Sequence, residues 1–129
     1  MTTFTDLARA NYVKLTTVRK SGVAVDTPVW VAGDGSALVV ITPAQSGKVK
    51  RARHTPQVSL QPCSMTGRAK KGSEPSQGTV EIVTDPAGLE AGIAALRRKY
   101  GWQFRLAFGN SQKRRNGSAS YVILRITGS

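Results

Sequence analysis

Several residue types are scarce in this chain of 129 residues, and each scarcity excludes a class of protein. Cys63 is the only cysteine, so no internal disulfide can form and a reducing compartment is the simpler expectation. His54 is the only histidine, which leaves no His-rich metal cluster and no triad of histidine, cysteine and acid. Neither a Walker motif nor a Gly-x-Ser-x-Gly motif occurs. We therefore expect no catalytic side chain and no metal site.

Long hydrophobic runs are also missing. No segment approaches the roughly 18 consecutive apolar residues that a membrane helix needs. The first six residues, Met1 to Asp6, lack the charged and apolar regions of a signal peptide. The length fits one domain, residues 1–129, large enough to bury a core. These features predict a single-domain cytoplasmic protein with no membrane partner.

Acidic residues are scarce as well, because seven Asp and Glu stand against nineteen Lys and Arg, for a formal net charge of +12. Such a charge attracts anionic partners. Nucleic acid is a common one, but aromatic residues make up only 6% of the chain and no zinc-finger, RNP or helix-turn-helix pattern is present. Nucleic acid is therefore the less favoured partner, and a polyanionic small molecule would be attracted by the same field.

Strand patterns dominate what is present. Runs rich in β-branched residues, separated by Gly, Ser and Asp turns, predict a mainly β fold of six antiparallel strands with two or three short helices. Such strands suit a closed or partly closed barrel better than an open sheet. Pro28 cannot donate a ladder hydrogen bond, so its strand must have an edge or a bulge there. The predicted strands cover residues 12–19, 23–31, 37–42, 58–61, 79–84 and 121–127.

The third of these strands runs through a short turn into a basic helix, and this junction is the most informative part of the chain. The Ser46 hydroxyl can cap the helix, Gly47 allows close approach, and Lys48 falls in the first turn. Free N–H groups and the helix dipole favour an anion at such a start. A plain capped surface helix would show the same pattern, so both interpretations stay open from spacing alone.

Three motifs resemble the pyridoxamine-phosphate-oxidase-like family of split β-barrel flavin and deazaflavin proteins: ITPAQSGK at residues 41–48, LTTVR at 15–19 and TPVW at 27–30. Three further strings are similar to an actinobacterial branch of coenzyme F420-dependent oxidoreductases: SGKVKR at 46–51, QPC at 61–63 and LRRKYG at 96–101. The resemblance extends from about Tyr12 to Thr127.

This resemblance implies a split-barrel homodimer with two cofactors in grooves between the subunits. The flavin-type ring would rest on the second strand and the phosphate on the strand–helix turn. Carried onto this chain, the ring contacts are Val25, Asp26, Thr27 and Pro28, with Thr42 at the ring-to-tail region and Gln61 as a further contact. The phosphate contacts are Ser46, Gly47, Lys48, Lys50 and Arg51.

The function implied is a coenzyme F420 (deazaflavin)-dependent oxidoreductase that transfers a hydride to an unsaturated organic acceptor. FMN is the alternative cofactor, and a cofactor carrier without turnover or a basic nucleic-acid-binding protein is the alternative class. The Trp-Arg-Leu-x-Pro ending of true pyridoxamine phosphate oxidases is missing, so pyridoxal synthesis is not expected. The cations of 68–71 or 113–115 either contact the glutamate tail of the deazaflavin or form solvated loops.

Overall fold

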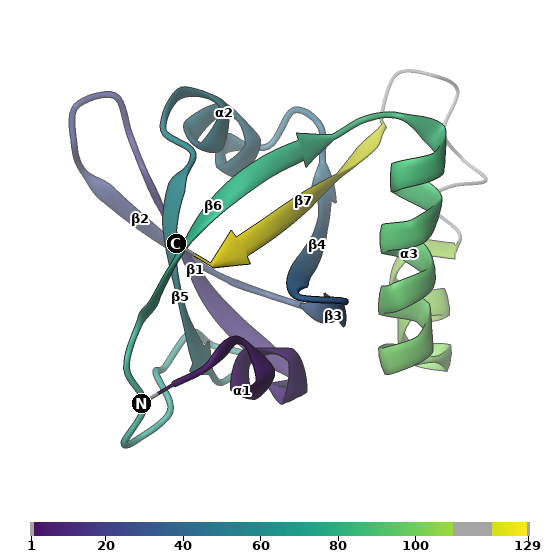
Figure 1. The fold of residues 1–129 in the computed structure, drawn as a ribbon, viewed down its shortest axis with the longest axis horizontal. Coiled ribbons are helices and arrows are strands. Elements are labelled where there is room, and N and C mark those ends of the chain that lie inside the picture. The colour runs from purple at the N-terminus through teal and green to yellow at the C-terminus, as the bar shows by residue number, and fades with distance from the viewer. Residues whose placement is uncertain (1, 110–119, 129) are drawn as a thin grey trace.

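A strongly curved antiparallel sheet forms the body of the molecule in the computed structural model, which describes residues 2–109 and 120–128 (Figure 1). Within those residues its strands follow the order β2-β1-β5-β6-β7-β4-β3, and every pairing is antiparallel. The sheet's two edges, β2 and β3, leave the barrel split. The strands are β1 (Tyr12–Val18), β2 (Ala24–Val29), β3 (Ala32–Asp34), β4 (Ala37–Pro43), β5 (Gln57–Cys63), β6 (Ser76–Val83) and β7 (Tyr121–Gly128).

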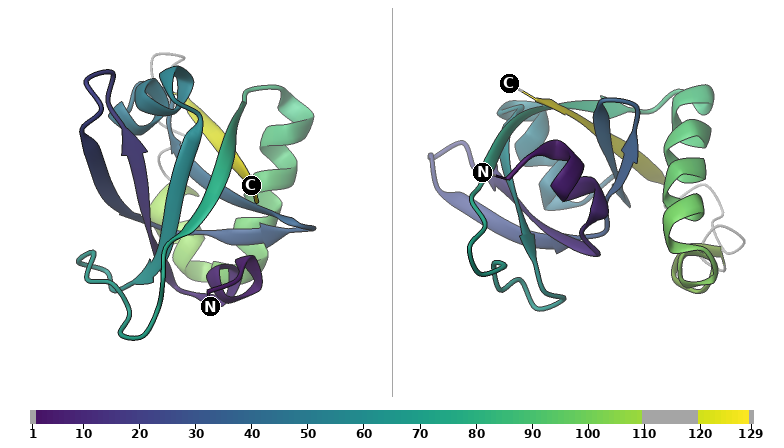
Figure 2. Two further views of the ribbon diagram at one scale, coloured as in Figure 1. Left: turned by 60° about the vertical axis from the view of Figure 1, so that its left-hand side comes forward. Right: turned by 60° about the horizontal axis from the view of Figure 1, so that its bottom comes forward.

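Helices cover both ends and one side of this barrel. The short helix α1 (Phe4–Arg9) lies across one end, and α2 (Gly47–His54) lies across the other (Figure 2). The long helix α3 (Pro86–Tyr100) packs on the outside, against β3, β4 and β7. It continues into α4 (Trp102–Phe104) and a π-helical turn, η1 (Arg105–Gly109). None of the helices in the described ranges has the length and apolar character needed to cross a membrane.

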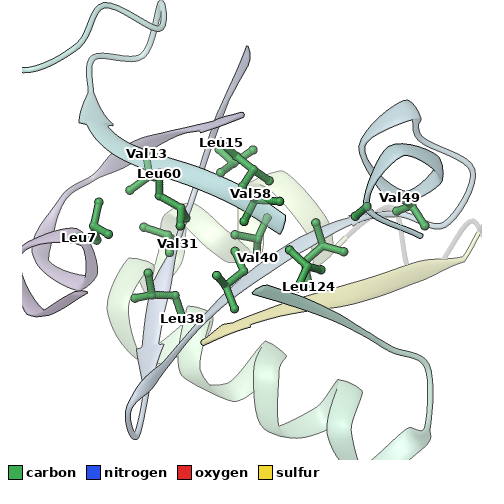
Figure 3. Close-up of a cluster of buried hydrophobic side chains, with 14 of the residues drawn as sticks. Leu7, Val13, Leu15, Val31, Leu38, Val40, Val49, Val58, Leu60 and Leu124 are labelled. Carbon is green, nitrogen blue, oxygen red and sulfur yellow. The ribbon is translucent and has the colours of Figure 1, made fainter. Parts of the chain in front are cut away.

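The hydrophobic core has two layers, and β4 belongs to both. Leu38 and Val40 point into the barrel with Leu15 and Leu60, as Figure 3 shows. On the other face of β4, the side chains Val39 and Ile41 pack under α3, in a cluster that also holds Leu96, Tyr100, Phe104 and Ile123. Leu38, Val40 and Ile41, in the third of the predicted strands, are each at least nine-tenths buried. Burying each such aliphatic side chain stabilises the fold by roughly 1.5–3 kcal/mol.

The strand count differs from the prediction of six, because the predicted strand 23–31 is divided. It stops at Val29, and β3 begins at Ala32 on the opposite edge of the sheet. At the break, the Val31 N–H donates to the hydroxyl of Tyr100 at 3.0 Å. This bond replaces the hydrogen bond that a backbone carbonyl of a neighbouring strand would accept. Pro28 lies on an edge strand, which confirms the inference from its missing N–H.

The prediction of two or three short helices was also incomplete. The described residues include α1, which was not predicted, and α3, whose 15 residues are not short. The start of α1 is a capping box, in which the Asp6 N–H donates to Thr3 Oγ1 at 3.1 Å and the Thr3 N–H donates to the Asp6 carboxylate at 2.9 Å. The start of α3 has Asp85 as the N-cap and Pro86 as the first helical residue.

Candidate functional site

The start of α2 carries no side-chain cap. Ser46 occupies the N-cap position with extended backbone angles, φ −68° and ψ 157°, but its hydroxyl does not bond to the helix. Instead Ser46 Oγ lies 3.0 Å from Oγ1 of Thr42, a buried residue near the end of β4, and the two hydroxyls share a hydrogen bond. The predicted Ser46 cap is therefore wrong. Because the Ser46 hydroxyl is hydrogen-bonded to Thr42 of β4, it does not accept from the first N–H groups of α2, and these have no side-chain cap.

Arg51 is folded back over this helix start. Its Nε donates to Oγ1 of Thr17 at 2.6 Å, and Thr17 is a fully buried residue of β1. Its Nη1 lies above Gly47, where a Cβ atom would be only 2.7 Å away. Gly47 therefore leaves the room in which the guanidinium of Arg51 sits against the first turn of α2. This arrangement places a fixed cation next to the uncapped N–H groups.

Lys48 is the second cation at the helix start. It is half-buried, and burial, reinforced by the neighbouring charge of Arg51, lowers the pKa of its ammonium group. The one ion pair in the described part of the chain joins Arg125 to Asp34 at 2.8 Å, so neither Lys48 nor Arg51 has a carboxylate partner there. A bound anion would offset both the desolvation of the Lys48 ammonium and its repulsion by Arg51. The residues at this turn therefore fit a phosphate group.

A pocket of about 310 Å³ opens beside Lys48, and we call it the apolar pocket. Trp30 forms part of its wall, and the Trp30 ring stacks on Tyr100 with ring centroids 4.4 Å apart and planes 9° apart. The Tyr100 hydroxyl is itself held by Val31 and by the carbonyl of Asn11 at 2.8 Å. The pocket is lined by Tyr12, Pro28, Val29, Trp30, Ile41, Thr42, Pro43, Lys48 and Ala107.

A second pocket, also of about 310 Å³, lies between the β1–β2 turn and the exposed side of α2. We call it the basic pocket, because its lining residues are Arg19, Lys20, Lys50, Arg51 and His54. Arg51 connects it with the helix start, since the same side chain lies over Gly47. Lys48 lines the apolar pocket and Arg51 lines the basic pocket, so both pockets adjoin the start of α2.

The chain matches the family model described as pyridoxamine 5'-phosphate oxidase over residues 3–128. It belongs to this family. No curated protein matches the chain. Its fold is the split β-barrel that the sequence motifs predicted, with the sheet left open between β2 and β3.

Solved structures show the same fold at low sequence identity. An F420 reductase shares 22% identity and a TM-score of 0.67, over 100% of this chain and 94% of the other. An FAD-binding protein from Mesorhizobium loti shares 18% identity and a TM-score of 0.61, over 95% and 82% of the two chains. HutZ, a heme storage protein from Vibrio cholerae, shares 13% identity and a TM-score of 0.70, over 94% and 83%. The fold therefore occurs with several kinds of bound group.

The structure brings the predicted residues of this family member into three groups. Pro28, Thr42 and Lys48 line the apolar pocket, while Lys50 and Arg51 line the basic pocket. Ser46 and Gly47 lie at the start of α2, as its N-cap and its first residue. The two pockets and the helix start therefore include all five predicted phosphate contacts.

The predicted ring contacts on β2 alternate between the two faces of the strand. Val25 and Thr27 are half-buried on the side of the barrel, whereas Asp26 and Pro28 are exposed. Asp26 accepts a hydrogen bond from the Thr16 hydroxyl at 2.7 Å. Because β2 is an edge strand, one side of its backbone is left for a ligand.

Gln61 is not brought to the pockets at α2. It lies on β5, where its Nε2 donates to the carbonyl and to the hydroxyl of Ser73, each at 3.1 Å. Lys70 and Lys71 line a different pocket, of about 370 Å³, between α1 and the β5–β6 loop. The predicted cationic run at 113–115 lies outside the described residues.

Sequence reasoning assigned no role to Tyr12, Trp30, Arg19 or Lys20, although all four line a pocket. A signal existed for Arg19 and Trp30, because each ends a motif that carried the family resemblance. The role of Thr17 in holding Arg51 was also missed. It joins positions 34 residues apart, which no local pattern connects.

Proposed function

We propose that this member of the family is an oxidoreductase that binds a phosphorylated flavin-type cofactor, coenzyme F420. The cofactor phosphate would bind at the start of α2 and its ring would lie in the apolar pocket along β2. The observation that carries this proposal is the uncapped helix start, which holds two neighbouring cations, Lys48 and Arg51, without a carboxylate partner in the described residues. Helix dipole and charge both favour a phosphate there.

The apolar pocket suits the ring end of such a cofactor. Pro28, Trp30 and Ile41 give it apolar walls, and Thr42 and Lys48 place polar groups at one end. A volume of about 310 Å³ is at the small end of ligand pockets, which run from roughly 300 to 1,000 Å³. We propose that a second copy of the chain completes the site over the open edge of β2, forming a homodimer.

The reduced deazaflavin, when bound, supplies the hydride that an unsaturated organic acceptor receives. The chain's residues would bind the phosphate, orient the ring against β2 and exclude water, which requires no acid or base from the protein. A formal charge of +12 favours a cofactor with several negative groups over FMN, which carries one phosphate. FMN is therefore the second choice of cofactor.

The test is a titration of the purified protein with coenzyme F420, FMN, heme and random-sequence DNA across a salt series. We expect the deazaflavin to saturate at one per subunit with the tightest affinity. Saturation by FMN alone would replace the proposed cofactor but keep the site. Binding of DNA alone, with a steep salt dependence, would contradict the proposal, as would saturation by heme alone. Oxidation of the reduced cofactor by enone, quinone and tetrapyrrole acceptors would then test turnover.

A further inference from the structure

The end of α3 carries a string of residues that neither pocket explains. LRRKYG, at residues 96–101, is one of the strings that carried the family resemblance, yet none of its residues lines the apolar pocket or the basic pocket. Two of its side chains, Lys99 and Tyr100, instead reach the barrel, where they form hydrogen bonds with the backbone. These bonds give the end of α3 a connection to the pocket that it does not line.

Lys99 and Tyr100 hold two backbone segments that are far apart in the sequence. Lys99 Nζ donates to the carbonyls of Ala10 and Val31, the latter at 2.6 Å. The Tyr100 hydroxyl donates to the carbonyl of Asn11 at 2.8 Å and accepts from the Val31 N–H at 3.0 Å. The last turn of α3 is therefore bonded both to the segment that leads into β1 and to the break that follows β2.

Each of these segments contains an aromatic wall of the apolar pocket. Tyr12 directly follows Asn11, and Trp30 directly precedes Val31. Trp30 lies in the break between β2 and β3, beyond the paired residues of either strand. Its ring stacks on the ring of Tyr100, with centroids 4.4 Å apart and planes 9° apart. Such stacking favours one orientation of the two rings, so Tyr100 orients the Trp30 wall from behind.

The position of Lys99 lowers the stability of the fold. Its ammonium is half-buried and lies 5.0 Å from the centroid of the Tyr100 ring, and no carboxylate pairs with it in the described residues. Burial lowers the pKa of Lys99 to about 8. Groups perturbed in this way are concentrated at functional sites. Together with the bonds to Ala10 and Val31, this cost indicates that Lys99 serves the neighbouring pocket.

We propose that Lys99 and Tyr100 are positioning residues of the apolar pocket, which hold Tyr12 and Trp30 in place for a flat aromatic ring. This inference rests on the proposed function, which places the cofactor ring in that pocket. Lys99 and Tyr100 act through the pocket walls, because neither of them lines the pocket. Their loss should therefore weaken binding of the ring and leave the phosphate site at Lys48 unchanged.

The test uses the fluorescence of Trp30 as its signal. The chain has two tryptophans, and Trp102→Phe removes the other one, which is 69% exposed. In this background, coenzyme F420 is titrated to saturation and then displaced by inorganic phosphate. The titration gives the affinity for the whole cofactor and the quenching of Trp30 by its ring, and the displacement gives the affinity of the phosphate site.

Four variants are compared in the Trp102→Phe background. Tyr100→Phe keeps the stacked ring and removes the hydroxyl, and Lys99→Met removes the ammonium. Arg98→Gln is the matched control, because it removes a charge from an exposed side chain in the same helical turn. Lys48→Ala is the reciprocal variant, at the proposed phosphate site.

We expect Tyr100→Phe and Lys99→Met to weaken the deazaflavin about tenfold, the upper range for a misaligned aromatic contact, and to change displacement by phosphate by less than about twofold. Both should also reduce the quenching of Trp30 at saturation, because a displaced indole no longer faces the ring. Arg98→Gln should change none of these quantities. Lys48→Ala should weaken phosphate and leave the quenching at saturation unchanged.

Unchanged affinity and quenching in both variants would overturn the positioning role. An equal loss of deazaflavin and phosphate affinity would overturn it as well, since it indicates a general loss of structure. If circular dichroism shows Tyr100→Phe to be unfolded, Lys99→Met decides alone, because methionine suits a half-buried position. Saturable binding of the deazaflavin without quenching of Trp30 would overturn this inference and leave the phosphate site standing. Failure of the deazaflavin to bind the unsubstituted protein would overturn the proposed function itself.

Discussion

Replacing Lys48 separates its proposed binding role from any structural one. In the free protein its ammonium is half-buried beside Arg51, and its pKa is lowered by burial and by that charge. Removing it from the free protein therefore relieves repulsion, and we expect the free energy of unfolding to stay the same or rise slightly. The anion-bound protein is different, because there Lys48 would make a charge-assisted contact.

Loss of that contact should cost about 1.5–3 kcal/mol of binding free energy. At 1.36 kcal/mol for each factor of ten, this is a roughly 10- to 150-fold weaker affinity for the deazaflavin. Lys48→Met is the matched variant, since it keeps an unbranched apolar side chain in the pocket wall and loses only the charge. Calorimetric titration gives the affinity and urea unfolding gives the stability. Unchanged affinity in both variants, or a stability loss as large as the affinity loss, would refute the assignment.

The pH dependence gives an independent check on Lys48. Its pKa is lowered in the free protein, and a bound phosphate would raise it. The extra affinity is therefore complete below the free-protein pKa and is lost as the pH rises through the pKa of the complex. The wild-type protein should lose affinity in alkaline solution, and Lys48→Met should lose less.

Three further predictions concern other residues of the fold. Gly47→Ala should displace the Arg51 guanidinium, since the new Cβ would lie 2.7 Å from Nη1. Calorimetry should then show weaker binding of the deazaflavin. The free energy of unfolding should stay within about 1 kcal/mol of wild type, because the higher helix propensity of Ala offsets part of the lost hydrogen bond to Thr17. Gly92→Ala should lower the urea midpoint, because the new Cβ would lie 2.7–2.9 Å from three carbons of Ile123 and overpacking costs about 1–3 kcal/mol. Adding Ile123→Val to this variant should recover part of the lost stability. Burial lowers the pKa of Lys99 to about 8 from an ordinary 10.5. Between these two pH values the unfolded chain holds the Lys99 proton and the folded protein does not, so the free energy of unfolding should rise with pH. Urea unfolding should show this rise from about pH 8 toward 10 in the wild-type protein but not in Lys99→Met.

Local patterns explain what could be predicted from the sequence. β4 was recognisable because it is apolar on both faces, and α2 because a polar turn and a basic run follow it directly. The division at Val31 was not predictable in this way, since it depends on the Tyr100 hydroxyl, 69 residues further along the chain. The capping box of α1 was a local signal, and it was present in Thr3 and Asp6 but not used.

The candidate site follows the same distinction. The family motifs pointed to the turn from β4 into α2, and Pro28, Thr42 and Lys48 do meet around one pocket. The Ser46 cap was predicted from residue type alone. Residue type cannot show that Ser46 Oγ instead forms a hydrogen bond with the hydroxyl of Thr42. The position of Arg51 depends on Thr17 in another strand and on the missing side chain of Gly47. Contacts of this kind form only when the strands and α2 have packed together in the folded protein.

The hydroxyl pair formed by Thr42 and Ser46 has a consequence for how such a site can arise or vanish. Thr42 belongs to β4 and is buried, whereas Ser46 is the N-cap residue of α2. A buried strand residue therefore determines whether the first N–H groups of α2 are capped. A strand residue without a hydroxyl at position 42 would free Ser46 to turn toward its own backbone. An uncapped helix terminus and a capped one can therefore differ by a single oxygen atom, on a residue that faces away from solvent.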